Sequence, residues 1–425
     1  MPISRRQFLK TSAAIVPAAA VMPAVFRRAV AASIYEQPSH PAPMGERTLV
    51  VVQMAGGNDG LNTVVPANDS RYYELRSDLA VAQEQVLALD RDTALHPALA
   101  MFKELWDESV LAIVEGVGYP DPSYSHFQSM DTWQTADPNG RQFDGWLARY
   151  LRGTMAAQED SFHALSVGRS LPRALYADGL SVPSIASVER YQFQADPRNP
   201  QDLASRTEAM SKLYASDPTA MPFGVLLDNT LEAAQRSSAA ILRAHAAYEP
   251  AVSYPDSKLG RGLRLMAEAI DGDLGVRVGH VRIGGFDTHA QQLPQHTELL
   301  TDMANSVHAF YRDLQAHGRD RNVVVMTWSE FGRRVTSNAS GGTDHGSAGP
   351  MFLVGTSVEG GLYGERPSLA DLDRNNLKFT TDFRSVYASV LESWLGAPAS
   401  IVLGAEFEQL PIMKARAGAT VSHTN

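Results

Sequence analysis

The sequence predicts an α/β fold of three layers, with a mostly parallel sheet between two layers of helices. Short apolar runs that stop at or near glycine recur along the chain, and stretches with helical spacing of apolar residues separate them. A continuous apolar run is typical of a strand buried on both faces, as in a parallel sheet that helices cover on both sides. The alternation of strands with helices indicates the same architecture.

The individual elements follow from these patterns in chain order. Apolar runs predict the strands, and apolar residues spaced three or four apart predict the helices. The strands are expected at 48–54, 110–114, 163–167, 276–283, 322–327 and 351–354. The helices are expected at 97–107, 125–135, 230–247, 293–317 and 382–394, the last with Asp382 as its N-cap.

Changes in composition divide the chain around a single domain, which is expected over 48–400. Residues 32–47 are rich in proline and polar groups and predict a flexible lead-in. Residues 179–256 are polar and alanine-rich with little strand signal, which predicts a mainly helical insertion. Residues 401–425 are expected to form a C-terminal tail.

The N-terminus has the three parts of a secretory signal peptide, over residues 1–31. Arg5 and Arg6 precede a weakly apolar stretch, and the small residues at 29–31 offer a cleavage site. Paired arginines indicate the twin-arginine route, so we expect export to the periplasm or beyond, with the twin-arginine translocation machinery as a partner. The alternative is a membrane helix, but the apolar stretch is shorter than the ~20 residues of a span and contains two prolines. No later stretch is apolar enough to cross a membrane.

Composition limits the partners of the mature chain. Residues 1–31 contain five basic and no acidic residues, so their removal leaves 32 basic and 47 acidic residues and a net charge of −15. This balance excludes nucleic acid as an expected partner, because phosphate backbones need a basic face. The chain has no cysteine, which excludes disulfides, thiolate metal sites and cysteine nucleophiles.

Polar side chains gather where the predicted strands end. In an open α/β sheet, ligands bind outside the carboxyl ends of the strands. Five loops are therefore expected to bring carboxylates, imidazoles and hydroxyls to one edge of the sheet. These loops are 56–62, 119–129, 284–289, 328–333 and 341–346.

Each cluster also has a purely structural interpretation. Asp59, in an Asn-Asp-Gly run, is more often a turn residue, and Ser123 or Ser125 before a helix is more often an N-cap. Glu330 has Arg333 and Arg334 nearby in sequence as alternative ion-pair partners. Taken together, however, histidines and carboxylates without cysteine form the ligand set of Zn, Mn or a similar divalent metal. Eight further histidines have no acidic residue beside them at the end of a predicted strand and are expected to be structural: His96, His163, His245, His280, His296, His308, His317 and His423.

At these motifs the sequence resembles the exported proteins of domain of unknown function 1501, which belong to an alkaline-phosphatase-like superfamily together with sulfatases. The resemblance covers roughly 48–400 and implies an alkaline-phosphatase-like form of the predicted fold. The motifs that carry it are Gly56 to Asn62, Ser125-His126-Phe127, Gly285 to His289, Ser329 to Arg333 and Asp344-His345-Gly346.

The resemblance also implies roles for particular residues. Ser125 would be the nucleophile, with Ser123 in reserve, and His126 and Arg333 would donate to the oxygens of the substrate. A divalent metal (Zn, Mn or Ca) would be held by residues from four loops: Asp59, Asp287, His289, Glu330, Asp344 and His345.

Two departures from the superfamily pattern bear on activity. Ser329-Glu330 stands where an Asp-His pair is usual, so one metal ligand is missing and weak turnover is expected. Asp287 and His289 are also closer in sequence than is common in the superfamily, so a single metal site or a lapsed one stays open beside a two-metal centre. The sequence argues against a standard sulfatase, because there is no cysteine and Ser125 is followed by His126 and Phe127 in place of the formylglycine motif. The resemblance thus implies a metal-dependent hydrolase of phosphate or sulfate esters, with a small-molecule ester or glycan as substrate. The alternative is a non-catalytic envelope protein that binds a glycan, a metal or a partner.

Overall fold

The computed structural model describes residues 47–414 except 155–161, 192–198, 200 and 215–223. The predicted signal peptide at 1–31, nearly all of the lead-in at 32–47, His423 and the last part of the tail lie outside the described residues.

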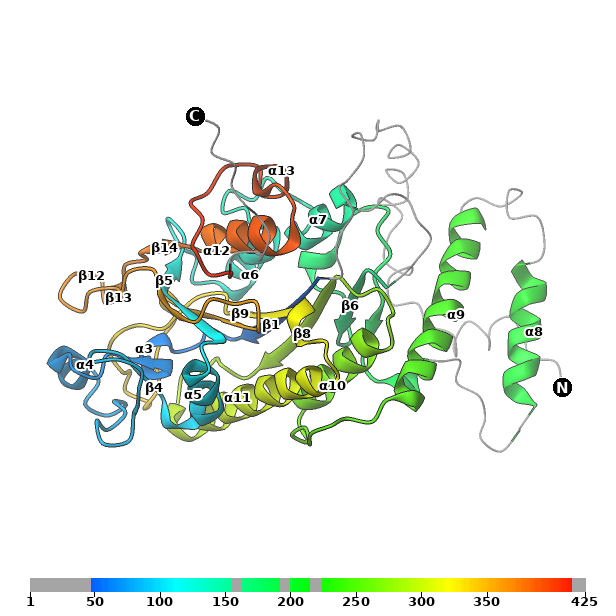
Figure 1. The fold of residues 1–425 in the computed structure, drawn as a ribbon. Coiled ribbons are helices and arrows are strands. Elements are labelled where there is room, and N and C mark those ends of the chain that lie inside the picture. Colours follow the sequence, from blue (N-terminus) through cyan, green and yellow to red (C-terminus); the bar gives the residue numbers. More distant parts are fainter. Residues whose placement is uncertain (1–46, 155–161, 192–198, 200, 215–223, 415–425) are drawn as a thin grey trace, which may run out of the picture.

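A single large sheet forms the centre of the protein (Figure 1). Its main strand order is β11-β5-β10-β9-β1-β8-β6-β7, and β14 also pairs with β5. All pairings are parallel except the two that β10 makes with β5 and β9. The strands are β1 (Thr48–Ala55), β5 (Leu111–Gly118), β6 (Ala164–Val167), β7 (Ser184–Ile185), β8 (Val278–Gly284), β9 (Val323–Trp328), β10 (Gly349–Val354), β11 (Gly361–Tyr363) and β14 (Thr381–Asp382).

Strand β1 explains why the sheet needs helices on both faces. All of its residues are buried, and consecutive side chains of a strand point to opposite faces. Val50 and Val52 belong to one hydrophobic core, and Leu49 and Val51 belong to the other. The continuous apolar run was therefore correctly interpreted as a strand buried on both sides, and the predicted three-layer fold is confirmed.

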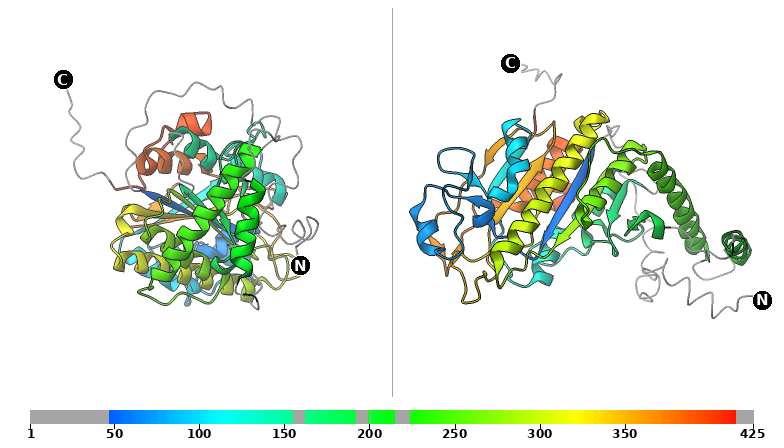
Figure 2. Two further views of the ribbon diagram at one scale, coloured as in Figure 1. Left: turned by 90° about the vertical axis from the view of Figure 1, so that its right-hand side faces the viewer. Right: turned by 90° about the horizontal axis from the view of Figure 1, so that it is seen from below.

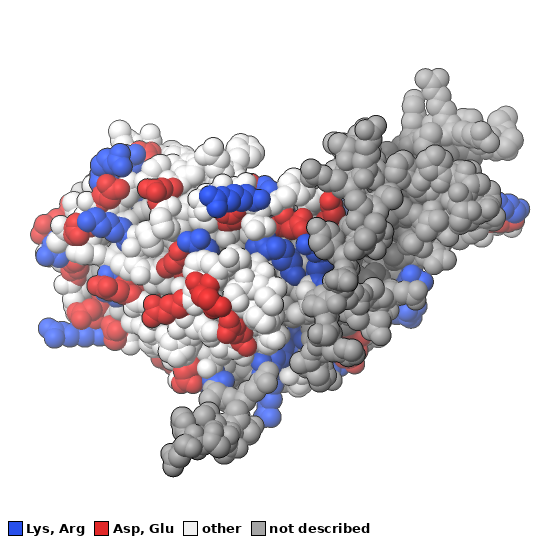
Figure 3. Space-filling view, turned by 90° about the horizontal axis from the view of Figure 1, so that it is seen from above, with Lys and Arg blue, Asp and Glu red and all other residues white. Residues whose placement is uncertain are grey.

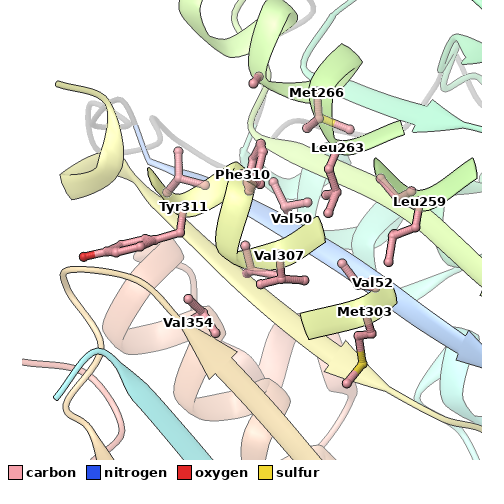
Figure 4. Packing of buried hydrophobic residues seen from close by; sticks show 14 of the residues in the cluster. Val50, Val52, Leu259, Leu263, Met266, Met303, Val307, Phe310, Tyr311 and Val354 are labelled. Carbon is pink, nitrogen blue, oxygen red and sulfur yellow. The ribbon is translucent and has the colours of Figure 1, made fainter. Parts of the chain in front are cut away.

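The first helical layer packs against Val50 and Val52. It contains α5 (Ala100–Asp107), α10 (Lys258–Asp271) and the long α11 (Gln292–Ala316). Figure 4 shows the core between β1, α10 and α11, with Leu263 of α10 and Val307 of α11 close to the two valines of β1. Helix α10 was not predicted from the sequence.

The second helical layer packs against the opposite face of the sheet. Its core includes Trp146, Tyr387 and Trp394, all of them buried. The Asp382 side chain accepts a hydrogen bond from the Arg384 N–H at 2.9 Å, so this predicted N-cap is formed. The helical elements of this layer are α6 (His126–Thr135), α7 (Trp146–Thr154), α12 (Phe383–Ser389), the π-helical η8 (Val390–Leu395) and α13 (Ala399–Leu403).

The described part of the predicted insertion is mainly helical. It contains α8 (Asp202–Tyr214) and α9 (Gly224–Ala247), together with the short strand β7. Both helices extend away from the sheet at the end where β6 and β7 lie (Figure 2). The expected tail differs from the structure, because residues up to 414 stay on the domain: Ile412 is fully buried and Met413 forms a β-bridge with Val358.

Several small elements had no signal in the sequence. The pair β12 (Leu372–Asp373) and β13 (Asn376–Leu377) forms a short hairpin. A second small sheet has the order β2-β4-β3, from β2 (Val64–Val65), β4 (Ala94–Leu95) and β3 (Leu87–Ala88). Strands of two residues are too short to show a period, so pattern alone does not predict them.

The surface and the helices bear on the expected partners. On the face seen in Figure 3, basic and acidic side chains of the described residues are interspersed, without a broad basic patch. No helix in the described part of the chain is both long and apolar enough to cross a membrane.

Candidate metal centre

The sheet topology brings the polar loops to one edge. Strands β1, β8 and β9 run parallel, so their carboxyl ends meet there. Strand β10 is antiparallel to both β9 and β5, so β10 begins at this edge and β5 ends at it. The loop that precedes β10, with His345, therefore joins the loops that follow the other four strands.

Asp287 is the carboxylate on which the cluster converges. Its Oδ1 lies 3.0 Å from the Nε2 atoms of both His345 and His289 and accepts a hydrogen bond from Arg333 Nη2 at 2.8 Å. Its Oδ2 lies 3.3 Å from His126 Nε2. Burial raises the pKa of Asp287, but hydrogen bonds from Arg333 and His345 and the charge of Arg333 outweigh it and bring the pKa to about 2. The carboxylate is therefore ionised at neutral pH.

The three histidines of this cluster are oriented alike. His345 Nδ1 donates to the carbonyl oxygen of Tyr124 at 2.7 Å, because a carbonyl can only accept. His126 Nδ1 lies 2.9 Å from Glu330 Oε1, and His289 Nδ1 lies 3.4 Å from Asp344 Oδ1. For His345 the carbonyl contact places a proton on Nδ1, and in all three rings Nε2 faces Asp287.

This arrangement suits a divalent cation. His126, Asp287 and His345 each offer one ligand atom, and these atoms lie within 4.8 Å of one another. His289 Nε2 lies only 2.9 Å from His345 Nε2, and two lone pairs at that distance repel unless a proton or a cation lies between them. Histidines that bind metals characteristically donate their other ring N–H to a carboxylate or a carbonyl. His345 does so, and the Nδ1 atoms of His126 and His289 each lie beside a carboxylate. The donor set therefore fits a metal ion.

Two carboxylates that were predicted as ligands lie beside the Nδ1 atoms of histidines, and their role as ligands stays a prediction. Asp344 lies beside His289 Nδ1, and a hydrogen bond from Asn338 lowers the pKa of Asp344. Glu330 is fully buried, and its Oε1 accepts from the Gly56 N–H at 2.9 Å as well as from His126. Glu330 Oε2 is buried and has no hydrogen-bond partner among the described residues. Such an atom signals a missing water or ion, so Glu330 keeps some capacity to bind one.

Asp59 lies in a separate buried ion pair. Its Oδ2 contacts Arg76 Nη1 at 2.5 Å and Gln292 Nε2 at 2.5 Å, and neither charged side chain is exposed. Burial raises the pKa of Asp59, but Arg76 outweighs burial, so the net shift is downward. Among the described residues, the group whose ligand atoms all lie close enough to share a metal is His126, Asp287 and His345, and it includes neither Asp59 nor His289. Its predicted role as a ligand stays a prediction, and Arg76 already supplies its counter-charge.

Arg333 connects the loops of the site. Its buried guanidinium donates to the backbone oxygens of Gly56, Gly57, Phe286 and Thr343, and to the carboxylate of Asp287. These oxygens belong to three of the five loops at this edge. Most of its N–H groups are thus already used, which leaves little capacity for the predicted contact with a substrate.

The serines at the edge have different environments. Ser125 is the N-cap residue of α6 and is exposed, and its side chain makes no cap hydrogen bond, so the structural interpretation as a cap does not hold. Ser123 Oγ donates to Gln128 Oε1 at 2.8 Å and accepts from the Ser125 N–H. Ser329 Oγ, in the place of the usual metal ligand, donates to the Met54 carbonyl and accepts from the Asn58 N–H.

Sequence reasoning missed three contributors to this edge. Arg76 is the C-cap residue of α4 (Ser70–Leu75), and nothing in its local pattern indicates a partner seventeen positions away. Gln292 links Asp59 to Thr288 and Thr343 through their hydroxyls. Ser129 Oγ donates to the Glu330 carbonyl. A helical spacing of three from His126 to Ser129, facing the same loop, was the only available signal.

The cluster opens into a cleft of about 560 Å³. His126, Asp287, Glu330 and Gly56 border it on one side, and side chains of α6 and β8 form the rest. A cavity of this size accommodates a small molecule.

The ionised Asp287 predicts a pH-dependent loss of stability in the metal-free protein. Its pKa in the folded state is below the ordinary 3.8, so its stabilisation is present above that value and is lost as the pH falls toward 2. In chelator, we expect Asp287→Asn to unfold at lower urea than the wild type at about pH 5, with the gap narrowing as the pH falls from about 4 toward 2. Asp256→Asn, at an exposed carboxylate, controls for the loss of one charge. A gap that does not change with pH would contradict the assignment.

The comparisons with known proteins give a family and a set of similar folds. A family model described as "Protein of unknown function (DUF1501)" matches residues 112–392, about two thirds of the chain. A search of the curated proteins finds no match.

Three solved structures illustrate how similar this chain is to proteins of known structure. PsFucS1 sulfatase from Pseudoalteromonas sp. is 9% identical, with 92% of this chain and 75% of that chain covered and a TM-score of 0.38. A protein of the alkaline phosphatase superfamily from Vibrio parahaemolyticus is 9% identical (90% and 77% covered, TM-score 0.36). The lipoteichoic acid synthase LtaP from Listeria monocytogenes is 10% identical (84% and 80% covered, TM-score 0.32). Likeness at this level assigns no role to any residue.

Proposed function

The chain belongs to the DUF1501 family of proteins of unknown function, and from its site we propose that it is a metal-dependent hydrolase of phosphate or sulfate esters. One observation carries the proposal. Three imidazoles, each with Nδ1 bound to a carboxylate or a carbonyl, present Nε2 to the carboxylate of Asp287. Unless the rings carry protons on Nε2, this arrangement sets several lone pairs against one anion, and a bound cation removes that repulsion.

We assign the ligands to His126, His289, His345 and Asp287. Glu330 and Asp344 orient two of the rings, and Arg333 holds the loops and keeps Asp287 ionised. A divalent ion bound there would neutralise charge on the oxygens of an ester and lower the pKa of a hydroxyl beside it. With Asp59 paired to Arg76, these residues support a single metal rather than two.

Ser125 is our candidate for the nucleophile. It lies between Tyr124, whose carbonyl binds His345, and His126, and its hydroxyl makes no cap hydrogen bond. After losing its proton, the Ser125 oxygen would attack phosphorus or sulfur as the bond to the leaving alcohol breaks and that alcohol takes up a proton. Water would then cleave the covalent ester and restore the serine. Free N–H groups at the start of α6 favour the anionic oxygens.

The experiment that tests the proposal combines metal analysis with a serine variant. We expect near-stoichiometric Zn, Mn or Ca in the natively exported protein, and slow hydrolysis of an aryl phosphate or sulfate that chelator abolishes. Ser125→Ala should lower the rate at least about 100-fold, as expected for loss of a nucleophile. It should change the free energy of unfolding by less than about 0.5 kcal/mol, because no cap bond is lost.

Ser123→Ala is the matched control. The Ser123 hydroxyl makes two hydrogen bonds, so this variant should be less stable while keeping most of the activity. If no ester in a panel with Zn, Mn, Mg and Ca is hydrolysed above the background of Ser125→Ala, the hydrolase proposal fails. Metal that stays bound without turnover would then favour a non-catalytic binding protein.

We also propose export through the twin-arginine route, on the paired Arg5 and Arg6 and the apolar stretch that follows them. Arg5→Lys with Arg6→Lys should leave the protein folded in the cytoplasm and absent from the periplasmic fraction. Normal appearance of the double variant in that fraction would refute this route.

A further inference from the structure

The cleft beside the metal centre has a second half, which is formed by residues other than the proposed metal ligands. Arg282 of β8 and Phe127, Met130 and Gln134 of α6 line it, next to His126 and Asp287. The proposed metal centre and nucleophile do not use these four residues.

Strand alternation places Arg282 on the face of the sheet that α6 covers. Its neighbours Val281 and Ile283 both pack in the core on the opposite face. Arg282 is also in register with Gln53 of β1, whose amide contacts Met130 Sδ on α6 at 3.3 Å. On the other side of β8, the pairing with β6 ends at Val281. Arg282 therefore has no strand neighbour on that side, and it is exposed.

Arg282 differs in its charge environment from the other charged residues of the cleft. Asp131 pairs with Arg173, Asp287 with Arg333, and Glu330 with His126. Within the described part of the chain, the Arg282 side chain has neither a hydrogen bond nor an ion-pair partner. The acidic side chains that line the cleft with it already have partners. A free guanidinium presents a fork of donors that suits a carboxylate, sulfate or phosphate.

Phe127 supplies the apolar part of this half. Its side chain is 90% exposed, although it follows directly on His126 at the start of α6. Met130 lies one helical turn further along and faces the same cleft. A ring that covers Phe127 removes apolar surface from water and gains a ring–ring contact.

We infer that the cleft selects esters whose alcohol part is an apolar ring bearing a second anionic group, with the ring against Phe127 and the anion at Arg282. This inference rests on the proposed hydrolase function, because it takes the reacting ester group to lie at His126 and Asp287. It names a class of substrate and two specificity-determining residues for that site.

Binding of two phosphonates that cannot be hydrolysed tests the inference without requiring turnover. The metal-loaded protein is titrated calorimetrically with benzylphosphonate and with 4-carboxybenzylphosphonate. We expect the carboxylate to improve the affinity of the wild type about tenfold, as one charge-assisted hydrogen bond does. Arg282→Gln should abolish this gain, whereas Arg91→Gln, at another exposed arginine, should keep it.

Phe127→Ala should weaken both phosphonates by the same few-fold factor, and Phe143→Ala, at an exposed phenylalanine outside the cleft, should weaken neither. The inference is overturned if the carboxylate brings no gain in the wild type, or if Arg282→Gln keeps the gain. Hydrolysis of aryl phosphates without any preference for the carboxylated ring would contradict this inference and leave the hydrolase proposal standing. A carboxylate-dependent affinity without turnover of any ester would support it and sink the hydrolase.

Discussion

Replacing Asp287 by asparagine should remove the metal from the protein. Asp287 contacts all three histidines of the centre and is the only one of the four proposed ligands with a negative charge. Structural zinc sites are worth about 10–16 kcal/mol over four ligands, so losing the anionic ligand should weaken binding on the order of a hundredfold or more. The measurement is metal affinity by competition with a chromogenic chelator, with the melting temperature as a check on folding.

Asp344→Asn is the control for this prediction. Asp344 acts through His289, and loss of such an orienting group typically costs only about 10–100-fold in metal affinity. Asp287→Asn should therefore be the weaker binder of the two. Equal metal content in wild type and Asp287→Asn after dialysis would place the metal elsewhere.

Replacing Arg76 by methionine should lower the free energy of unfolding by about 3–5 kcal/mol, because it leaves the carboxylate of Asp59 buried without its counter-charge. Arg76 also donates to the backbone carbonyls of Val335 and Arg334, which lose their donor as well. Urea unfolding in the presence of chelator isolates this effect from metal binding.

Two further variants make the result specific. The double variant Asp59→Asn with Arg76→Met should recover part of the loss, since no unpaired charge remains. Arg71→Met removes an exposed pair with Asp69 and should cost at most about 1 kcal/mol. If Arg76→Met is no worse than Arg71→Met, the buried pair does not stabilise the fold in this way.

Which edge of the sheet carries the site could be predicted from the sequence. The apolar run of β1 reveals burial on both faces, and Asp287 and Glu330 each come within three residues of the end of a strand. Because parallel strands end at a common edge, these local facts place distant residues together. The antiparallel course of β10 was not foreseen, yet His345 precedes that strand, and an antiparallel strand begins where its parallel neighbours end.

The roles within the edge were not predictable in this way. A carboxylate becomes a ligand, an orienting group or half of an ion pair according to differences of a few ångströms, and packing between distant elements sets those distances. Thus Asp59 meets Arg76 from α4, Glu330 meets His126 from α6, and Arg333 meets backbone oxygens of separate loops.

The sequence by itself determined the layers, the six longer strands of the main sheet and the edge at which the polar loops gather, because periodicity and burial are local properties of the chain. The short strands β7, β11 and β14 of that sheet were not predicted. Only the tertiary structure decided that three imidazoles share one carboxylate and that Asp59 is neutralised by Arg76. It also decided that Arg282 lines the same cleft as Phe127, without a side-chain partner among the described residues. Those outcomes depend on which charges meet across the sheet edge, and no local pattern encodes such distances.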